Sequence, residues 1–411
     1  MVWWVHKYKQ NHCKFGVYFG LDVTVDRIVQ TINIMFDCLP LVADNNFYDT
    51  YDIQALLTTG VNIFNIDRTV HDGYFYEKVK GIIKNTNEIC ECYPSSYYRP
   101  IGLSVTMSVL EPVDIDNEVD ILILKNVMKK EQFLEFRKQN KNSASMPILL
   151  MLAKFNVEDT NELIKISDGI ILDMITINFI DEVCDNVTEQ CKKAGKPVIY
   201  LMPKLAEEYY EPYAADRQIL TTATQLVDKG VDGVMLVDSN ELTKPPTEIV
   251  LSLVKGIWIA ENDVQVDEVY YKQSFEMDIP VLPPLSTAMA ASLGALKVGA
   301  KAIIIMTVSG KSARMMSFAA PPCTVLAITT RKETARRLHL YRKVVPLFYD
   351  KGRAQNWHQE WRNRVDFGTD FGLKTGLFCT GAKLVVLAPS EESTGYCDGF
   401  QIVAVPFICN E

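Results

Sequence analysis

Eight short runs of apolar and β-branched residues recur through the first 240 residues of this 411-residue chain. Longer segments with helical periodicity separate most of them, and several of those segments end in glycine, as helix C-caps do. The runs are continuously apolar, which is typical of parallel strands that are covered on both faces. Eight such units in succession predict a (β/α)8 barrel. The expected strands span residues 27–35, 61–67, 101–107, 121–125, 148–153, 169–174, 197–202 and 233–238.

The connection between the third and fourth expected strands is unusually short. It consists of residues 108–119, with the sequence SVLEPVDIDNEV, and Pro112 lies within it. A full helix does not fit there easily, because proline disrupts the interior of a helix. This interval is the one clear departure from the repeating pattern.

A second α/β pattern begins after residue 260. A helical segment precedes an apolar run at 302–307, and further apolar runs follow. We therefore expect a barrel domain over residues 1–260 and a C-terminal α/β domain over residues 261–411. The sequence SGKS at 309–312 follows a strand, where free backbone N–H groups can bind phosphate. It lacks the upstream glycine of a P-loop, so a plain strand–turn–helix connection is the alternative.

Composition argues against several classes of function. The net charge of −9 gives no electrostatic footprint for nucleic acid or an anionic membrane, and no apolar run approaches the length of a membrane helix. The 10 cysteines are irregularly spaced, which favours free thiols in a reducing compartment over a zinc site. We expect a cytoplasmic protein without nucleic-acid or membrane partners, with an amphipathic transit peptide as the alternative.

Charged side chains follow several of the expected strands. They include Asp67, Lys125, Lys154, Asp173 and Asp238. Functional residues of (β/α)8 barrels lie at the C-terminal ends of the strands, so these groups are expected to converge on one mouth. Lysines and acids gathered there could bind a phosphate or metal–phosphate ligand. Ordinary solvated rim charge is the alternative.

Five collinear segments resemble the pyruvate kinase family. Residues 301–348, which hold SGKS and TARRLHLYRK, resemble the C-terminal domain of that family. The others are GVNIFNIDRT (60–69), residues 150–171, AGKPVIYLMPKL (194–205) and GVDGVMLVDSNELTKPPTEIV (230–250). The resemblance implies a (β/α)8 barrel followed by a C-terminal α/β domain. Family members insert a lid domain after the third strand, so the short segment at 108–119 implies that this lid has been lost.

The resemblance also implies which residues would act in phosphoryl transfer from phosphoenolpyruvate to ADP. Lys154 matches the catalytic lysine of the family. The two carboxylates that bind Mg2+ in the family fall at Asn156 and Thr176, which are neutral. Magnesium normally needs one or two carboxylates, so this site is expected to be degenerate unless Glu158 or Asp173 compensates.

Further positions of the family pattern have changed. The substrate arginine falls at Asn65, and a threonine near the substrate falls at Met202. The K+ site of the family corresponds to Asp67, Thr69 and Thr106, whose oxygens imply weak binding of a monovalent cation.

The effector site of the family lies in its C-terminal domain and binds a sugar bisphosphate. The loop lysine of that site is replaced here by Val308, and Gly395 matches a later loop. The other matching residues are Thr307, Ser309, Ser312, Trp357 and Arg364. They predict either residual binding of a phosphosugar or another anion, or a purely structural role for the same side chains.

These observations leave three functions open. The first is a catalytically impaired or inactive relative that acts as a structural or interaction module, for example in a scaffold such as that of a flagellum. The second is an active or weakly active pyruvate kinase that requires Mg2+ and K+. The third is a regulatory subunit that binds a phosphometabolite. We expect a homo-oligomer, or a hetero-oligomer with a paralogue.

Overall fold

The computed structural model describes the barrel strands, most helices and nearly all of the C-terminal third of the chain. The described residues are 33–37, 56, 59–69, 73–92, 100–110, 118–140, 146–153, 157–174, 182–202, 214–237, 246–391 and 394–406. None of the helices in these ranges is long and apolar enough to cross a membrane.

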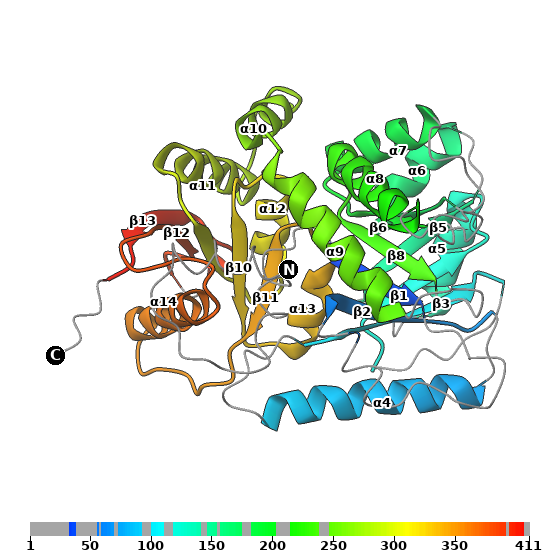
Figure 1. Ribbon diagram of the computed structural model, residues 1–411, viewed down its shortest axis with the longest axis horizontal. Helices are drawn as coiled ribbons and strands as arrows, with labels where there is room; N and C mark the ends of the chain where they lie inside the picture. Colours follow the sequence, from blue (N-terminus) through cyan, green and yellow to red (C-terminus); the bar gives the residue numbers. More distant parts are fainter. Residues whose placement is uncertain are drawn as a thin grey trace.

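Eight parallel strands close into a barrel, which confirms the predicted (β/α)8 architecture (Figure 1). Closure is made by β1, which pairs in parallel with both β2 and β8. The described part of the first strand, β1, starts at Asn33, and the predicted strand positions 27–32 lie outside the described residues. The strands are β1 (Asn33–Asp37), β2 (Val61–Asp67), β3 (Gly102–Ser108), β4 (Ile121–Lys125), β5 (Ile148–Leu152), β6 (Gly169–Asp173), β7 (Val198–Leu201) and β8 (Gly233–Val237).

Alternate residues of these strands face opposite sides of the barrel wall. Ile121 and Ile123 belong to the apolar cluster inside the barrel, whereas Leu122 and Leu124 pack outward beneath the helices. Burial on both sides explains why the sequence reads as continuous apolar runs. The surrounding helices are α4 (Gly73–Cys92), α5 (Lys130–Gln139), α6 (Val157–Ile166), α7 (Glu182–Lys193), α8 (Ala214–Lys229) and α9 (Pro246–Asn262).

The connection from β3 to β4 is as short in the structure as in the sequence. Strand β3 ends at Ser108, and β4 begins at Ile121. Its two ends are tied to the barrel, since Val109 N donates to Lys125 O and Asp120 N donates to Leu103 O, at 3.2 and 2.9 Å. Residues 111–117 lie outside the described residues.

The second unit is a five-stranded sheet in the order β11-β10-β9-β12-β13. All neighbours pair in parallel except β12 and β13, which are antiparallel. Helices α11 and α12 cover one face and α14 covers the other, giving three layers (Figure 1). The elements are α10 (Val266–Phe275), α11 (Leu285–Val298), β9 (Ala302–Met306), α12 (Lys311–Phe318), β10 (Thr324–Thr329), α13 (Lys332–Arg337), β11 (Val344–Phe348), α14 (Trp357–Lys374), β12 (Lys383–Ala388) and β13 (Gly399–Ala404). The domain boundary at 260/261 stays a prediction.

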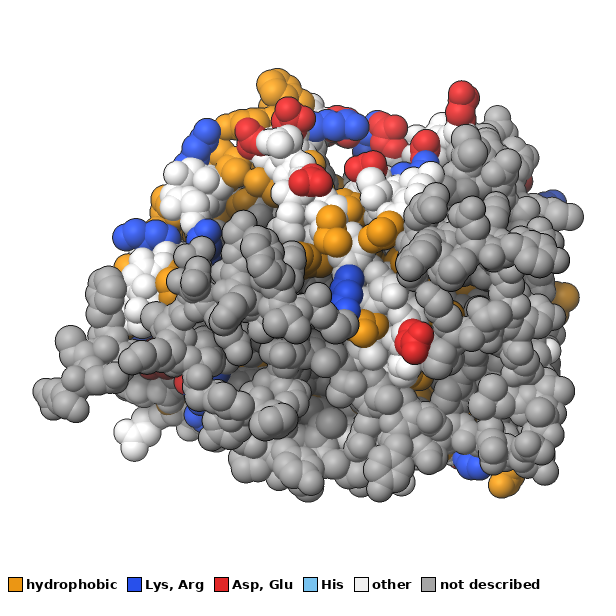
Figure 2. Space-filling model, in the orientation of Figure 1, with side chains coloured by type: hydrophobic (Ala, Val, Ile, Leu, Met, Phe, Trp, Pro, Cys, Tyr) orange, Lys and Arg blue, Asp and Glu red, His pale blue; other side chains and the backbone are white. Residues whose placement is uncertain are grey.

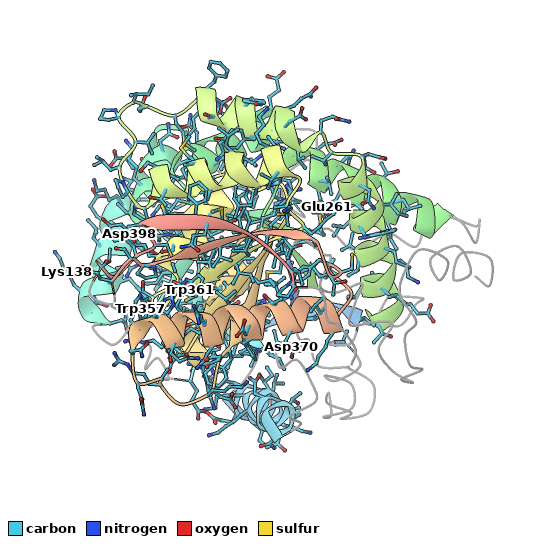
Figure 3. The ribbon with its side chains drawn as sticks, turned by 90° about the vertical axis from the view of Figure 1, so that its left-hand side faces the viewer. Lys138, Glu261, Trp357, Trp361, Asp370 and Asp398 are labelled. Carbon is cyan, nitrogen blue, oxygen red and sulfur yellow. The ribbon has the colours of Figure 1, made fainter. Side chains whose placement is uncertain are left out.

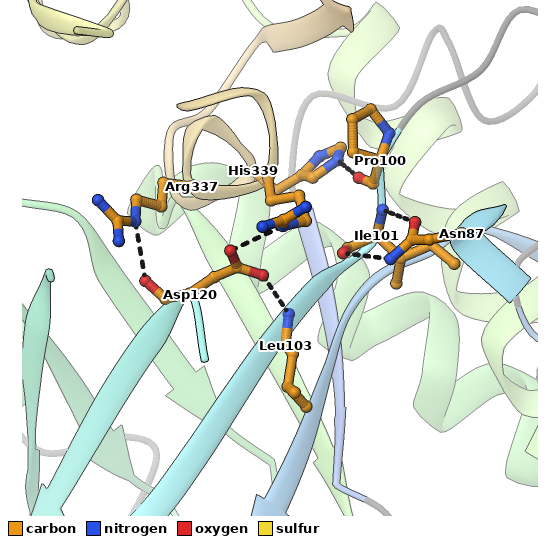
Figure 4. A network of polar contacts seen from close by, with 8 residues as sticks. Asn87, Pro100, Ile101, Leu103, Asp120, Arg337 and His339 are labelled. Atoms are coloured by element: carbon orange, nitrogen blue, oxygen red, sulfur yellow. Dashed lines mark hydrogen bonds and ion pairs between the residues drawn. The ribbon is translucent and has the colours of Figure 1, made fainter. Parts of the chain in front are cut away.

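Helix α13 joins this second unit to the barrel through buried polar contacts (Figure 4). The Asp120 carboxylate, 2% exposed, accepts from Arg336 Nε at 2.7 Å and from Leu103 N at 3.0 Å. Arg337 Nε donates to Asp120 O, and His339 Nε2 lies 2.8 Å from Pro100 O. Burial raises the pKa of the Asp120 carboxyl, and the Arg336 guanidinium opposes that rise. These contacts lie at the N-terminal ends of β3 and β4, so the second unit packs against the bottom of the barrel and leaves the mouth clear.

Candidate functional site

The C-terminal ends of β2, β3 and β4 bring a set of polar side chains together at the barrel mouth. The register pairs Asn65 with Ser104, and Asp67 with Thr106. One strand further, Ser108 is paired with Lys125. Because functional groups of such barrels lie at this end, these residues form the candidate site.

Asn65 is the centre of a hydroxyl cluster inside the barrel wall. It is 0% exposed, and its Oδ1 accepts hydrogen bonds from Ser104 Oγ at 2.9 Å and from Thr106 Oγ1 at 3.1 Å. The position where the resemblance expects a substrate-binding arginine therefore holds a neutral amide whose acceptor is used within the protein. Buried polar groups need such partners, and the network accounts for their burial here.

Asp67 is bonded on both of its carboxylate oxygens. Oδ1 accepts from Thr69 N at 2.9 Å and from Thr69 Oγ1 at 2.6 Å, and Oδ2 accepts from the Lys125 ammonium. The Asp67 side chain is 5% exposed, whereas that of Lys125 is 30% exposed. Asp67, Thr69 and Thr106 were predicted to offer oxygens to a monovalent cation, and the structure brings them together. The structure also places a cation of the chain itself, the Lys125 ammonium, against the Asp67 carboxylate.

A potassium ion does not fit these residues as they stand. One oxygen of Asp67 is held by the Lys125 ammonium and the other by two donors from Thr69. The Thr106 hydroxyl donates to Asn65 and keeps its own lone pairs, so the Lys125 ammonium is the group that excludes the ion. A second positive charge beside the ammonium would also be repelled.

The divalent-metal positions cannot be placed in the same way. Lys154, Asn156 and Thr176 lie outside the described residues, so their predicted roles stay predictions. Within the described ranges, no group of three or more His, Cys, Asp and Glu side chains is arranged to hold a metal ion. Met202 is buried in the outer apolar core, 4% exposed, and brings no hydroxyl to the mouth.

The loop after β9 is organised by internal hydrogen bonds. Thr307 Oγ1 accepts from Gly310 N at 3.0 Å, and Gly310 begins α12 in the left-handed region at φ 81°. Ser312 is buried, and its Oγ accepts from Cys397 N at 2.9 Å. Burial raises the pKa of the Cys397 thiol to about 12, so the group beside Ser312 stays neutral. Ser309 is exposed.

Trp357 and Arg364 lie on α14, which Figure 3 shows crossing the sheet with Trp357 at its first turn. Trp357 Nε1 donates to Pro389 O at 3.3 Å. Arg364 is 8% exposed, and its Nε donates to Glu360 Oε1 at 2.7 Å. Its guanidinium also lies 5.6 Å from the Tyr349 ring centroid. Of the predicted effector residues, Thr307, Ser312, Trp357 and Arg364 thus each have a partner within the protein.

The pairing of Lys125 with Asp67 was not predicted from the sequence. Both residues were expected at strand ends, as separate groups on the rim. The available signal was their position: both residues end strands that flank β3, and consecutive strand ends of a parallel barrel converge on one mouth.

Comparisons with known proteins place these features in a family context. Residues 286–403 match the family model described as "Pyruvate kinase, alpha/beta domain". Pyruvate kinase of Candida albicans is 24% identical over 74% of this chain and 63% of its own length. Pyruvate kinase 2 of Saccharomyces cerevisiae is 24% identical over 82% and 70%. Pyruvate kinase 1 of Trypanosoma brucei brucei is 27% identical over 61% and 51%. The chain thus spans between about half and 70% of the lengths of these relatives.

Proposed function

Because this chain belongs to the pyruvate kinase family, we propose that it is a catalytically impaired member that acts as a structural or interaction module. The observation that carries the proposal is the Lys125 ammonium on Asp67, at the place where the resemblance expects potassium. The Lys125 ammonium is covalently attached and therefore holds its charge at one place in the mouth. A bound K+ ion, by contrast, can shift to suit its ligands.

The loss of activity follows from how phosphoryl transfer is catalysed. That reaction depends on positioning and on cations that neutralise developing charge. Loss of one such electrostatic contact commonly lowers the rate by about 100- to 1000-fold. Asn65 brings no charge to the mouth and Met202 no hydroxyl, and the β3–β4 connection leaves little room for a lid. Lids exclude water from such reactions, so their absence compounds the loss.

A pyruvate-formation assay tests this proposal directly. Purified protein is supplied with phosphoenolpyruvate, ADP, Mg2+ and K+, alongside the Lys154→Met variant as a matched control. We expect the wild type to form pyruvate no faster than the variant. Turnover that depends on Mg2+ and disappears in Lys154→Met would refute the proposal and favour an active or weakly active pyruvate kinase.

Assembly is the second part of the proposed module, with the cytoplasm as its setting. Strand β13 is the edge of the second sheet, and Ile402 on it is 46% exposed. An edge strand offers unpaired N–H and C=O groups that can pair with another chain. We expect a homo-oligomer, or a hetero-oligomer with a catalytically active relative. Light scattering on the protein alone and mixed with such a relative distinguishes the two, and a monomer in both samples would contradict the expectation.

A further inference from the structure

A large cleft lies between the bottom of the barrel and the second unit, far from the mouth. Its volume is about 1310 Å3, and its walls come from α7, the C-terminal end of α8, α10, α12 and the residues just before β11. Figure 2 shows blue and red side chains along the upper margin of the molecule, over the region where α10 and α7 face each other in Figure 1. The half-buried charged groups in its walls include Asp232 and five cations: Lys192, Lys196, Arg314, Arg342 and Lys343.

The three lysines among these cations have no carboxylate partner among the described residues. Lys192 donates to Lys229 O, Lys196 to Ser167 O at 2.6 Å, and Lys343 to Pro321 O at 2.7 Å. A charged ammonium held only by a backbone carbonyl is poorly compensated when it leaves water. The cleft therefore contains positive charge that the protein itself does not fully neutralise.

The neighbouring arginines also contribute positive charge, and that of Arg342 is partly offset by Glu261, whose Oε1 lies 3.5 Å from Arg342 Nη2. Burial lowers the pKa of Lys192, and repulsion from Arg342 lowers it further. The same two causes lower the pKa of Lys343 to about 8. The Nε atoms of Arg314 and Arg342 are buried and make no hydrogen bond within the described structure. Donors that lack acceptors are what an anion would satisfy.

The acids of the cleft offset only part of this charge. Five of them are exposed, so solvent screens them: Asp185, Glu189, Asp228, Glu276 and Asp278. Asp232 lies among the cations and offsets part of their charge, and its carboxylate also accepts from Val198 N at 3.0 Å and Arg342 N at 3.1 Å.

Two of the cations converge over one glycine. Gly230 directly follows α8 and has φ +64°, and a Cβ built on it would stand 2.6 Å from Lys192 Nζ and 3.2 Å from Arg342 Nη1. A side chain at this position would displace the Lys192 ammonium and the Arg342 guanidinium, and it would strain the backbone. Glycine here leaves the space in front of the two donors open to a ligand.

We infer that this cleft binds a small molecule bearing a phosphate group, held by Lys192, Lys343 and Arg342. Phosphate suits the site because it offers several strong acceptor oxygens and a double negative charge. The site lies at the opposite end of the barrel from the mouth, so the inference does not depend on whether the chain retains phosphotransfer activity.

Isothermal titration calorimetry tests the inference with three probes at matched ionic strength: inorganic phosphate, pyrophosphate and glycerol 3-phosphate. Chloride is the reference anion. Tighter binding of glycerol 3-phosphate than of inorganic phosphate identifies a phosphate ester as the ligand class, and the reverse order identifies the free anion. We expect Lys192→Met and Lys343→Met each to weaken binding about tenfold, since charge-assisted hydrogen bonds are the strong ones. Lys138→Met, on the exposed surface of α5, should leave it unchanged.

A loop variant separates this cleft from the loop after β9. Ser309→Asp places a negative charge in that loop, and it should not alter binding in the cleft. The inference is overturned if no probe binds more tightly than chloride, if both cleft variants bind as the wild type does, or if Ser309→Asp alone abolishes binding.

Lysine footprinting gives a readout on the unmodified chain, in case a cleft variant does not fold. A lysine with a pKa near 8 is partly unprotonated at that pH and reacts readily with an acylating reagent. We expect pyrophosphate to reduce acylation of Lys192 and Lys343 several-fold, relative to Lys138 in the same sample. Equal acylation with and without pyrophosphate would contradict the inference.

Discussion

Replacing Lys125 with methionine isolates the contact that organises the barrel mouth. The variant keeps a flexible unbranched side chain and removes the ammonium from the Asp67 carboxylate. Breaking a buried ion pair from one side costs about 3–5 kcal/mol, because the remaining charge is left uncompensated. Here the Lys125 side chain is 30% exposed and Asp67 keeps its two bonds from Thr69. We therefore expect a smaller loss of unfolding free energy, about 2 kcal/mol.

The same variant should create a site for potassium. With the ammonium gone, Asp67, Thr69 and Thr106 offer oxygens to a free cation. For a site with a dissociation constant of about 10 mM, 100 mM K+ would restore about 1.4 kcal/mol. The wild type should be equally stable in potassium chloride and in choline chloride, because the Lys125 ammonium already occupies the position of the cation.

Urea unfolding in the two salts, followed by tryptophan fluorescence and circular dichroism, measures both effects. Lys138→Met is the matched control, since Lys138 is exposed on α5. The double variant Lys125→Met/Asp67→Asn should recover part of the lost stability, because no unpaired charge remains. A Lys125→Met protein as stable as the wild type, with no preference for potassium, would refute the reasoning about this site.

Three further predictions concern the rest of the molecule. Asp120→Ala should uncouple the barrel from the second unit, because Arg336 loses its buried partner; calorimetry should then resolve two transitions where the wild type shows one. Arg364→Met should cost about 3 kcal/mol by leaving the buried Glu360 carboxylate without its partner, while Arg364→Met/Glu360→Gln should recover most of that loss; urea unfolding measures both. Lys343 has a folded-state pKa of about 8 against 10.5 in the unfolded chain, so the folded state binds fewer protons between these values. Unfolding free energy should therefore rise by about 1–2 kcal/mol from pH 8 to pH 10, a slope that Lys343→Met should remove. The titratable and charged groups that influence Lys343 are Arg342, Glu261 and Cys323.

The architecture could be predicted from the sequence because burial of a strand restricts the residue types within that strand. A parallel strand covered on both faces must be apolar throughout, so the runs at 121–125, 148–153 and 169–174 are visible without any knowledge of their neighbours. The short connection between β3 and β4 is equally a fact of spacing. The salt bridge between Glu360 and Arg364 also had a local signal, since the two residues are four apart on one helix.

The partners of the other buried charges were decided only by the tertiary structure. Asp67 and Lys125 are 58 residues apart, and Asp120 and Arg336 are 216 apart. Their pairing depends on strand register and on how the second unit packs against the barrel, neither of which a linear pattern records. The cationic cleft has the same origin, because its lysines and arginines come from separate elements and look like ordinary surface charge in the sequence. Each buried strand residue must itself be apolar, so hydrophobic burial is visible in the sequence. A charge is instead neutralised by whichever group the tertiary structure brings within a few ångströms of it.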